Sequence, residues 1–184
     1  QAELGAAIGL PTVVDNDANT AAYAEHRLGA ARGMRDAMVI TLGTGIGGGV
    51  IVHDRILRGA HGFAAEIGHF QIDPNGPMCA CGEPGHWEAA ASGTALGRMA
   101  REAAARGDAP AVLAAAGGDV GAVRGTHVSA AARAGEPDAL ALVDAYAANV
   151  AIGLVALANI FDPGIIAISG GLVNDGDLFL DPIR

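Results

Sequence analysis

Residues 66–88 read EIGHFQIDPNGPMCACGEPGHWE, and this stretch indicates a metal-binding loop. It holds both cysteines of the protein between two histidines, in the order His69, Cys79, Cys81, His86. Four nitrogen and sulfur ligands on one short loop suit a tetrahedral zinc ion and leave no position open for water. The spacing differs from that of the common zinc fingers, so two buried thiols with two surface histidines are the competing interpretation.

The bulk composition excludes several classes of function. The chain has 184 residues, enough for one domain or a large piece of two, and 51% of them are apolar. The net charge is −9 and no lysine occurs, so we expect no nucleic-acid partner. Two cysteines separated by one residue cannot staple a secreted fold, which favours metal binding in the cytoplasm. The longest apolar run, residues 147–161, is too short to span a bilayer; we expect a buried helix there and no membrane partner.

Apolar periodicity and turn residues predict mixed secondary structure. Strands are expected at residues 10–14, 37–42, 50–52, 56–57, 66–72 and 165–169, and helices at 18–28, 87–106, 110–116, 126–134 and 137–161. A glycine loop at 43–49 separates two of the strands, and Gly170-Gly171 turns the chain toward a last helix. Strands and helices with glycine turns at strand ends indicate an α/β fold, in which ligands bind beyond the carboxyl ends of strands.

The glycine loop contains a literal G-x-G-x-x-G at Gly43, Gly45 and Gly48. A dinucleotide fingerprint must open a helix, whereas a strand is expected here, so that interpretation is rejected. A glycine-rich turn between strands can still hold phosphate through backbone N–H groups, and the Thr44 hydroxyl adds a donor. The absence of lysine excludes a Walker loop. A plain tight hairpin is the alternative.

Four blocks of sequence together resemble the ROK family of sugar kinases and sugar-responsive repressors, and most of all its bacterial glucokinases. They are Asp15-Asn16-Asp17-Ala18-Asn19, residues 42–49, Glu66-Ile67-Gly68-His69, and Cys79-x-Cys81-Gly82-x-x-Gly85-His86-x-Glu88 running on to Ser92-Gly93. The turn Ser169-Gly170-Gly171 looks like the adenosine motif of that family. One position departs from the pattern: His86 stands where the family usually has a third cysteine.

The resemblance implies an actin-like ATPase (ribonuclease H-like) fold in two lobes, with sugar and ATP meeting in the cleft. Residues 1–35 would be the end of the small lobe, and residues 36–184 most of the large lobe, truncated at its C-terminus. The zinc loop would occupy about 69–88. The first phosphate loop of the family would precede this sequence, so we expect the chain on its own to be inactive.

The resemblance also assigns roles to individual residues. Asp17 would be the catalytic base; helix capping is the alternative role, and Asp15 or Asn16 could cap the helix equally well. The sugar would be bound by Asn16, Glu66, His69 and Glu88, the nucleotide by Gly43, Thr44, Gly45, Gly170 and Gly171, and a structural zinc by His69, Cys79, Cys81 and His86. Mg-ATP would be the phosphoryl donor.

The expected function is ATP-dependent phosphorylation of a hexose at its 6-hydroxyl, with glucose as the leading substrate. The sugar-sensing domain of a ROK-type repressor is the alternative, and an inactive remnant is a third. The family further implies a cytoplasmic homodimer or higher homo-oligomer.

Overall fold

The computed structural model describes residues 1–183, which contain one four-stranded sheet in the order β3-β2-β1-β4. β1 (Ala37–Leu42) pairs antiparallel with β2 (Ile46–Val52) and parallel with β4 (Ile165–Ser169). β2 also pairs with β3 (Arg55–Ile56). The expected α/β class and the strands at 37–42 and 165–169 are confirmed. Residue 184, the end of the predicted large lobe, lies outside the described residues.

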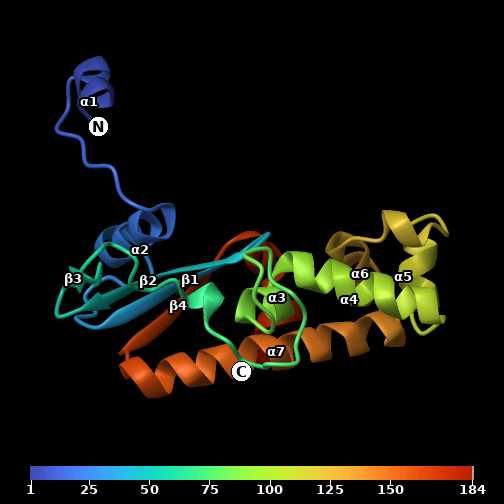
Figure 1. Ribbon diagram of the computed structural model, residues 1–184. Coiled ribbons are helices and arrows are strands. Elements are labelled where there is room, and N and C mark those ends of the chain that lie inside the picture. The colour runs from blue at the N-terminus through green and yellow to red at the C-terminus, as the bar shows by residue number, and fades with distance from the viewer. Residues whose placement is uncertain (184) are drawn as a thin grey trace.

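Helices cover both faces of the sheet. Alternate residues of β1 point to opposite sides, so the strand contributes to the packing on each face. Val39 packs with Ala22 of α2 (Asp17–Leu28) in a small apolar cluster. Met38 and Ile40 belong to the main core on the other face, which α7 (Pro137–Phe161) crosses (Figure 1). Since α2 packs directly on this sheet, residues 17–28 and the sheet form one layered unit; a lobe boundary near residue 35 stays a prediction.

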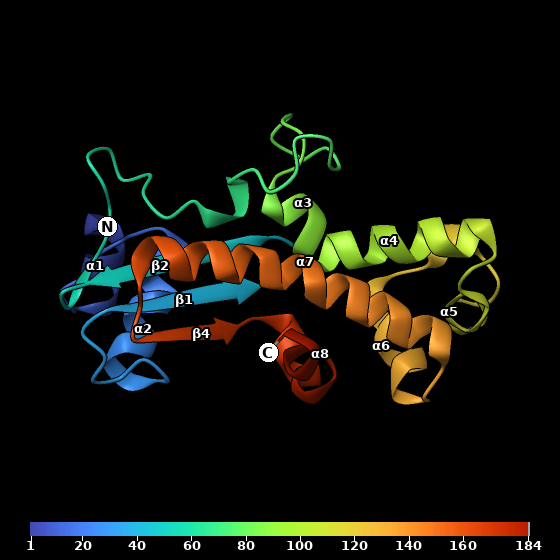
Figure 2. The same ribbon diagram turned by 90° about the horizontal axis from the view of Figure 1, so that it is seen from below.

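The remaining helices extend the molecule beyond one end of the sheet (Figure 2). They are α3 (Trp87–Ala91), α4 (Gly93–Arg106), α5 (Pro110–Ala115), α6 (Gly125–Arg133) and α8 (Gly176–Ile183), with two short 3-10 helices, η2 (Val120–Ala122) and η3 (Gly171–Asp175), between them. A third 3-10 helix, η1 (Ile67–His69), precedes α3 and packs on β2. α1 (Ala2–Ile8) stands apart from this body.

α7 has the bounds that the sequence predicts. Proline stands at its first position, where no backbone donor is needed, and Asp162 in the left-handed conformation ends it before Pro163. Within the described residues it is the one helix whose length and apolar composition would allow a membrane span. Core helices of soluble proteins pass the same test, and here Val143, Tyr146 and Val150 are buried against the body.

Two predicted strands are wrong. Residues 10–14 form no strand, because no neighbouring strand among the described residues offers hydrogen bonds to them, and Leu10, Val13 and Val14 are exposed. Residues 66–72 contain η1 instead of a strand. A Cβ on Gly68 would lie 2.3 Å from the carbonyl oxygen of Ile46, so close contact with β2, not strand pairing, shapes this segment.

The predicted helix at 87–106 is two helices. Ser92 has an extended backbone (φ −88°, ψ 170°) between α3 and α4, and its hydroxyl oxygen accepts the N–H of Ala95 as a helix cap. The break turns α4 away from α3. It also brings the start of α4 to the hairpin between β1 and β2, where the Gly93 N–H donates to the Gly43 carbonyl at 2.7 Å.

Candidate functional site

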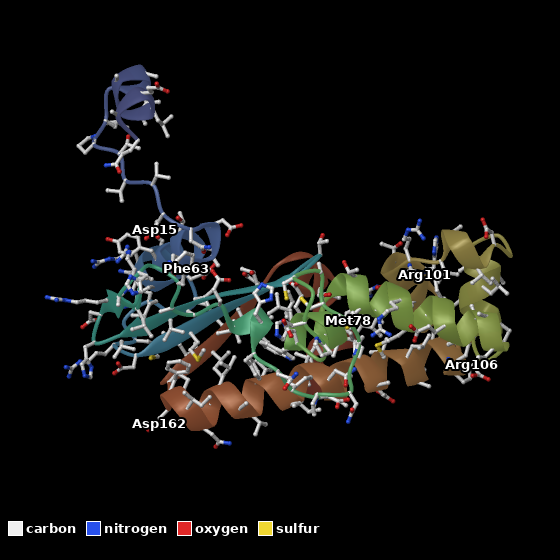
Figure 3. The ribbon with its side chains drawn as sticks, in the orientation of Figure 1. Asp15, Phe63, Met78, Arg101, Arg106 and Asp162 are labelled. Atoms are coloured by element: carbon white, nitrogen blue, oxygen red, sulfur yellow. The ribbon has the colours of Figure 1, made fainter. Side chains whose placement is uncertain are left out.

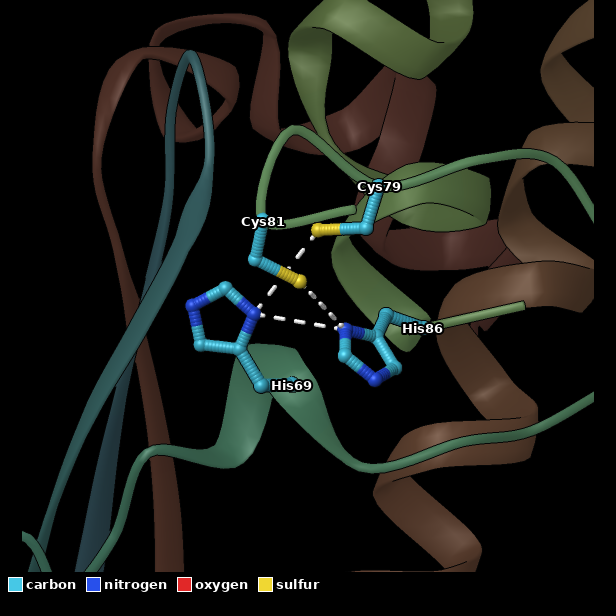
Figure 4. A group of neighbouring side chains, drawn as sticks. All are labelled: His69, Cys79, Cys81 and His86. Carbon is cyan, nitrogen blue, oxygen red and sulfur yellow. Dashed lines mark hydrogen bonds between the residues drawn. The ribbon is translucent and has the colours of Figure 1, made fainter. Parts of the chain in front are cut away.

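The four residues predicted as metal ligands come together in the structure (Figure 4). Their ligand atoms all lie within 4.8 Å of one another. His69 Nδ1 is 3.7 Å from Cys79 Sγ and 3.4 Å from His86 Nδ1, and Cys81 Sγ is 3.2 Å from His86 Nδ1.

These separations fit a tetrahedral ion. Zinc bonds of about 2.0–2.1 Å to nitrogen and about 2.3 Å to sulfur place neighbouring ligand atoms roughly 3.3–3.8 Å apart. The three distances between ligand atoms given above fall in or next to that range. Both histidines turn Nδ1 to the centre, so each keeps Nε2 free of it. The donor set and its spacing therefore fit one zinc ion.

The loop is shaped by its own backbone. Cys79 N–H donates to the Glu83 carbonyl and Gly82 N–H to the Cys79 carbonyl, which makes a tight turn around Cys81. Gly85 has φ +69°, and a Cβ on it would lie 1.5 Å from the Asp73 carbonyl oxygen, so only glycine fits there. Burial raises the pKa of the Cys79 thiol above its ordinary 9.0, an effect that a bound cation would oppose.

The end of the loop is anchored in the core by Trp87, which is fully buried and directly follows the predicted ligand His86. The Trp87 indole N–H donates to the Asn149 carbonyl at 3.0 Å, and the Asn149 side-chain N–H donates to the Ala90 carbonyl at 3.2 Å. The Tyr146 hydroxyl donates to the Ala91 carbonyl at 2.8 Å. α7 thus holds α3, and through α3 the last of the predicted metal ligands, in place.

Glu88 joins the metal loop to the β1–β2 hairpin. One of its carboxylate oxygens accepts the backbone N–H of Ile46 at 2.9 Å, and the other accepts the Cys79 thiol at 3.7 Å. A Cβ on Gly45 would lie 2.2 Å from the first of these oxygens, so glycine is what allows the carboxylate to come so close. The residue predicted to bind sugar therefore also fixes the hairpin.

The glycine run has two separate structural uses. Residues 43–45 form the hairpin turn, whereas Gly47 to Gly49 lie in β2. A Cβ on Gly49 would lie 2.3 Å from Ala22 Cβ, and one on Gly48 would lie 2.1 Å from Ile67 Cδ1. The later glycines therefore let α2 and η1 pack on the strand, and only the first part of the run is available to a ligand.

A cavity of about 880 Å³ opens beside the hairpin. Of the predicted nucleotide-binding residues, Gly43, Thr44 and Gly171 line it, and Gly45 lines a neighbouring cavity of about 380 Å³ with Glu88. Gly170 has a packing role, because a Cβ on it would lie 2.3 Å from the Leu42 carbonyl oxygen. The carboxyl ends of β1 and β4 therefore converge on one cavity of nucleotide size, as the α/β rule predicts.

Sequence reasoning missed other residues of this cavity. They are Gly93, Thr94, Leu96, Gly97, Arg101, Gly121, Arg124, Gly125, Thr126, Ser129, Leu172 and Asp175. One signal was present: Gly93 and Gly97 lie one helical turn apart and mark a face of α4 that another segment approaches closely. The two arginines supply positive charge beside the cavity, and the Arg101 guanidinium also donates to the Val123 carbonyl at 3.1 Å.

The predicted base and its neighbours lie at the start of α2. The Asn16 side-chain oxygen caps the helix by accepting the N–H groups of Ala18 and Asn19, at 2.9 and 3.1 Å. Asp17 is exposed, and one of its carboxylate oxygens accepts the Ala18 N–H at 2.9 Å. Capping is thus mainly the work of Asn16. Glu66 is exposed at the start of η1, three residues before His69.

Comparison with known proteins gives a consistent answer. A sequence profile described as the ROK family matches residues 1–184. A glucokinase of Streptomyces coelicolor is 46% identical over 181 residues, 97% of this chain and 57% of the relative. A ROK family glucokinase of Streptomyces griseus, solved with glucose and AMPPNP, is 44% identical with a TM-score of 0.88 and covers all of this chain. A ROK family transcriptional regulator, a homologue of the E. coli MLC protein, is 32% identical with a TM-score of 0.81. The chain spans 57% of the curated relative's length and 59% of the S. griseus chain.

Proposed function

The chain belongs to the ROK family, and on that premise we propose that it is the greater part of an ATP-dependent hexose kinase with glucose as its substrate. The similarity to glucokinases over nearly the whole chain supports this proposal. The observation that carries it is the position of Glu88. Its carboxylate lies between the metal loop and the hairpin beside the large cavity, so a sugar bound at Glu88 would have a nucleotide as its neighbour.

We assign the nucleotide, as Mg-ATP, to the cavity lined by Gly43, Thr44 and Gly171. Its size suits a nucleotide, and backbone N–H groups of a glycine turn are natural phosphate donors. Arg101 and Arg124 offset the phosphate charge in a chain without lysine. Phosphoryl transfer depends mostly on positioning and charge stabilisation. The N–H groups of the glycine turn would position the phosphates, and the two arginines would stabilise their charge.

The sugar would lie between two groups of side chains. Asn16 and Asp17 at the start of α2 form one group, and Glu66, His69 and Glu88 form the other. We assign Asp17 as the base. It accepts the proton of the sugar 6-hydroxyl as that oxygen bonds to the γ-phosphorus, while the bond from that phosphorus to ADP breaks. One carboxylate oxygen of Asp17 accepts a helix N–H, and the other carries no hydrogen bond within the described part of the chain. That second oxygen is available for the proton.

A zinc ion held by His69, Cys79, Cys81 and His86 would have a structural role in this kinase. Four protein ligands leave no coordination position for substrate, so the ion would stabilise the loop that presents His69 and Glu88. His69 would use Nδ1 for the ion and Nε2 for a sugar hydroxyl, consistent with the ring orientation in Figure 4. We further propose that the protein forms a homodimer; Ile152, Val155 and Ile160 leave apolar surface exposed on α7.

The test is an ATP-consumption assay on the full-length protein with glucose, mannose, fructose and N-acetylated hexoses. We expect turnover with glucose, and its loss in Asp17→Asn while calorimetry still detects sugar binding. Asp144→Asn, an exposed carboxylate on α7, is the matched control and should keep full activity. A loss of less than about tenfold in Asp17→Asn, below the usual contribution of a general base, would exclude Asp17 from that role.

The repressor remains the second candidate, because the MLC homologue matches 99% of this chain. A repressor would bind the sugar without consuming ATP. Sugar binding by calorimetry together with absent turnover for every sugar tested would favour it over the kinase.

A further inference from the structure

The loop at residues 57–66 connects β3 to the segment that carries the metal ligand His69. Arg58 stands near its beginning and Glu66 at its end. The Ala64 N–H donates to the Arg58 carbonyl at 3.2 Å, which closes the loop on itself. Ala65 then adopts φ +69°, a left-handed conformation that turns the chain into Glu66. The position of Glu66 therefore depends on where this loop is held.

Arg58 holds the loop against the start of α2, where Figure 3 labels Asp15. Its Nε and one terminal nitrogen both donate to Asp15 Oδ2, at 2.9 and 2.6 Å. The partners are 43 residues apart in the sequence, so the ion pair joins two segments that the local chain does not connect.

Asp15 passes this contact on to α2. Its second oxygen, Oδ1, accepts the backbone N–H of Asn16 at 2.9 Å and the side-chain N–H of Asn19 at 3.3 Å. Asn19 is buried, and Asn16 is the residue that caps the helix. The Arg58 guanidinium is the main reason that the pKa of Asp15 lies below its ordinary value, which keeps the carboxylate charged for all of these bonds.

We propose that Arg58 is a positioning residue of the sugar site: through Asp15 it fixes the start of α2, with Asp17, relative to the loop that ends at Glu66. The inference rests on the proposed kinase function, since Asp17 and Glu66 are its base and one of its sugar ligands. The side-chain hydrogen bonds of Arg58 go to Asp15 and not to Asp17 or Glu66. Its effect is on their separation, and a misplacement of about 1 Å can cost about 10²-fold in rate.

If the Arg58–Asp15 pair only stabilised the fold, its loss would lower the melting temperature and leave the kinetics unchanged, and we expect the opposite. The Arg58 side chain is 54% exposed, and exposed pairs contribute little to folding. Loss of the pair should therefore leave the melting temperature within about 4 °C of wild type while the reaction is impaired. The KM for the sugar and kcat should change and the KM for ATP should not, because no residue of loop 57–66 or of residues 15–19 lines the nucleotide cavity.

The experiment compares Arg58→Gln with Arg55→Gln in the full-length protein. Arg55 is an exposed arginine on β3, three positions away, and its replacement changes the net charge equally. We expect Arg58→Gln to lower kcat/KM for glucose at least tenfold with the KM for ATP changed less than twofold, and Arg55→Gln to match wild type. Arg58→Lys should recover only part of the loss, because an ammonium group lacks the fixed guanidinium geometry.

Asp15→Asn removes the same pair from the other side and should reproduce the loss, and the double variant should be no worse than either single variant. Equal kinetics of Arg58→Gln and Arg55→Gln, or losses that simply multiply in the double variant, would overturn the coupling while the kinase assignment stands. A wild-type protein that neither binds nor phosphorylates any hexose would overturn the proposed function, and the coupling with it.

Discussion

Replacing Gly153 by alanine should destabilise the protein, although alanine is the better helix former. Gly153 lies inside α7 and faces the indole of Trp87. A Cβ at this position would lie 2.0 Å from Trp87 Cε2 and 2.4 Å from its Nε1, far inside van der Waals contact. The indole is fully buried and its N–H is bonded to the Asn149 carbonyl, so it cannot move away without breaking that bond.

The expected change in stability is the sum of two unfavourable contributions and one favourable contribution. Overpacking a core costs about 1–3 kcal/mol, and loss of the indole hydrogen bond costs about 1 kcal/mol more. Alanine in place of glycine inside a helix returns about 1 kcal/mol. The free energy of unfolding should therefore fall by about 2 kcal/mol, which for a chain of this size corresponds to a melting temperature lower by about 4–8 °C.

Urea unfolding followed by far-UV circular dichroism measures this change. Gly176→Ala is the matched control: it also lies in a helix, and its added Cβ would have Leu180 Cδ1 as its nearest neighbour, at 3.6 Å. The control should be neutral or slightly stabilising. Trp87→Phe then supplies a double-mutant cycle, in which Gly153→Ala should cost less once the indole is gone. If Gly153→Ala has wild-type stability, or costs equally much in the wild-type protein and in the Trp87→Phe variant, the added Cβ does not collide with the indole.

Three further changes probe the metal loop, the loop before Glu66 and the far side of the cavity. Cys81→Ser should lose the single equivalent of zinc expected in protein purified without added metal, and should unfold at lower temperature because structural zinc contributes folding energy; unchanged metal content would rule out this ligand. Ala65→Gly should raise the urea midpoint, by roughly 0.5–1 kcal/mol in stability, because glycine accepts φ +69° without strain; a lower midpoint would contradict this. Arg133 holds the pKa of Asp175 below its ordinary 3.8, so this pair stabilises the fold above that pH and is lost as the pH falls through the lower, folded-state value; Arg133→Gln should return the pKa toward 3.8 by NMR titration, and an unmoved value would show another cause.

The elements that the sequence predicts well carry their signals locally. The strand at 37–42 is apolar at every position except Thr41, and the structure buries it on both faces between α2 and α7. α7 begins at a proline and ends at an Asp-Pro pair, and both are signals within the helix termini themselves. The clustering of His69, Cys79, Cys81 and His86 has the same local origin, since all four lie within 18 residues on a loop that turns on its own glycines; the zinc ion itself stays a prediction.

The elements that the sequence predicts wrongly depend on partners far away in the chain. Residues 10–14 have strand composition, but a strand needs a neighbour to accept its hydrogen bonds. Residues 66–72 alternate as a strand does, yet Gly68 brings them against the Ile46 carbonyl and the chain turns into η1. Pattern alone cannot distinguish these outcomes, because it contains no information about what lies opposite.

The same limit applies to the glycines of the chain, because the groups that require them lie far away in the sequence. Gly45 and Gly49 stand four residues apart in one run, but the first makes room for the Glu88 carboxylate and the second for Ala22 of α2. Gly153 occurs in a helix where alanine would be expected, and its reason is an indole 66 residues earlier in the sequence. At each of these glycines, the group that approaches the backbone explains why no larger residue fits. Trp87 and Glu88 are two of those groups, and they are the next two residues after the predicted ligand His86. The glycines at 45 and 153 therefore connect the loop that ends at His86 to the hairpin on one side and to α7 on the other. A change at either glycine should therefore alter the affinity of the proposed zinc site as well as stability, although neither residue belongs to that site.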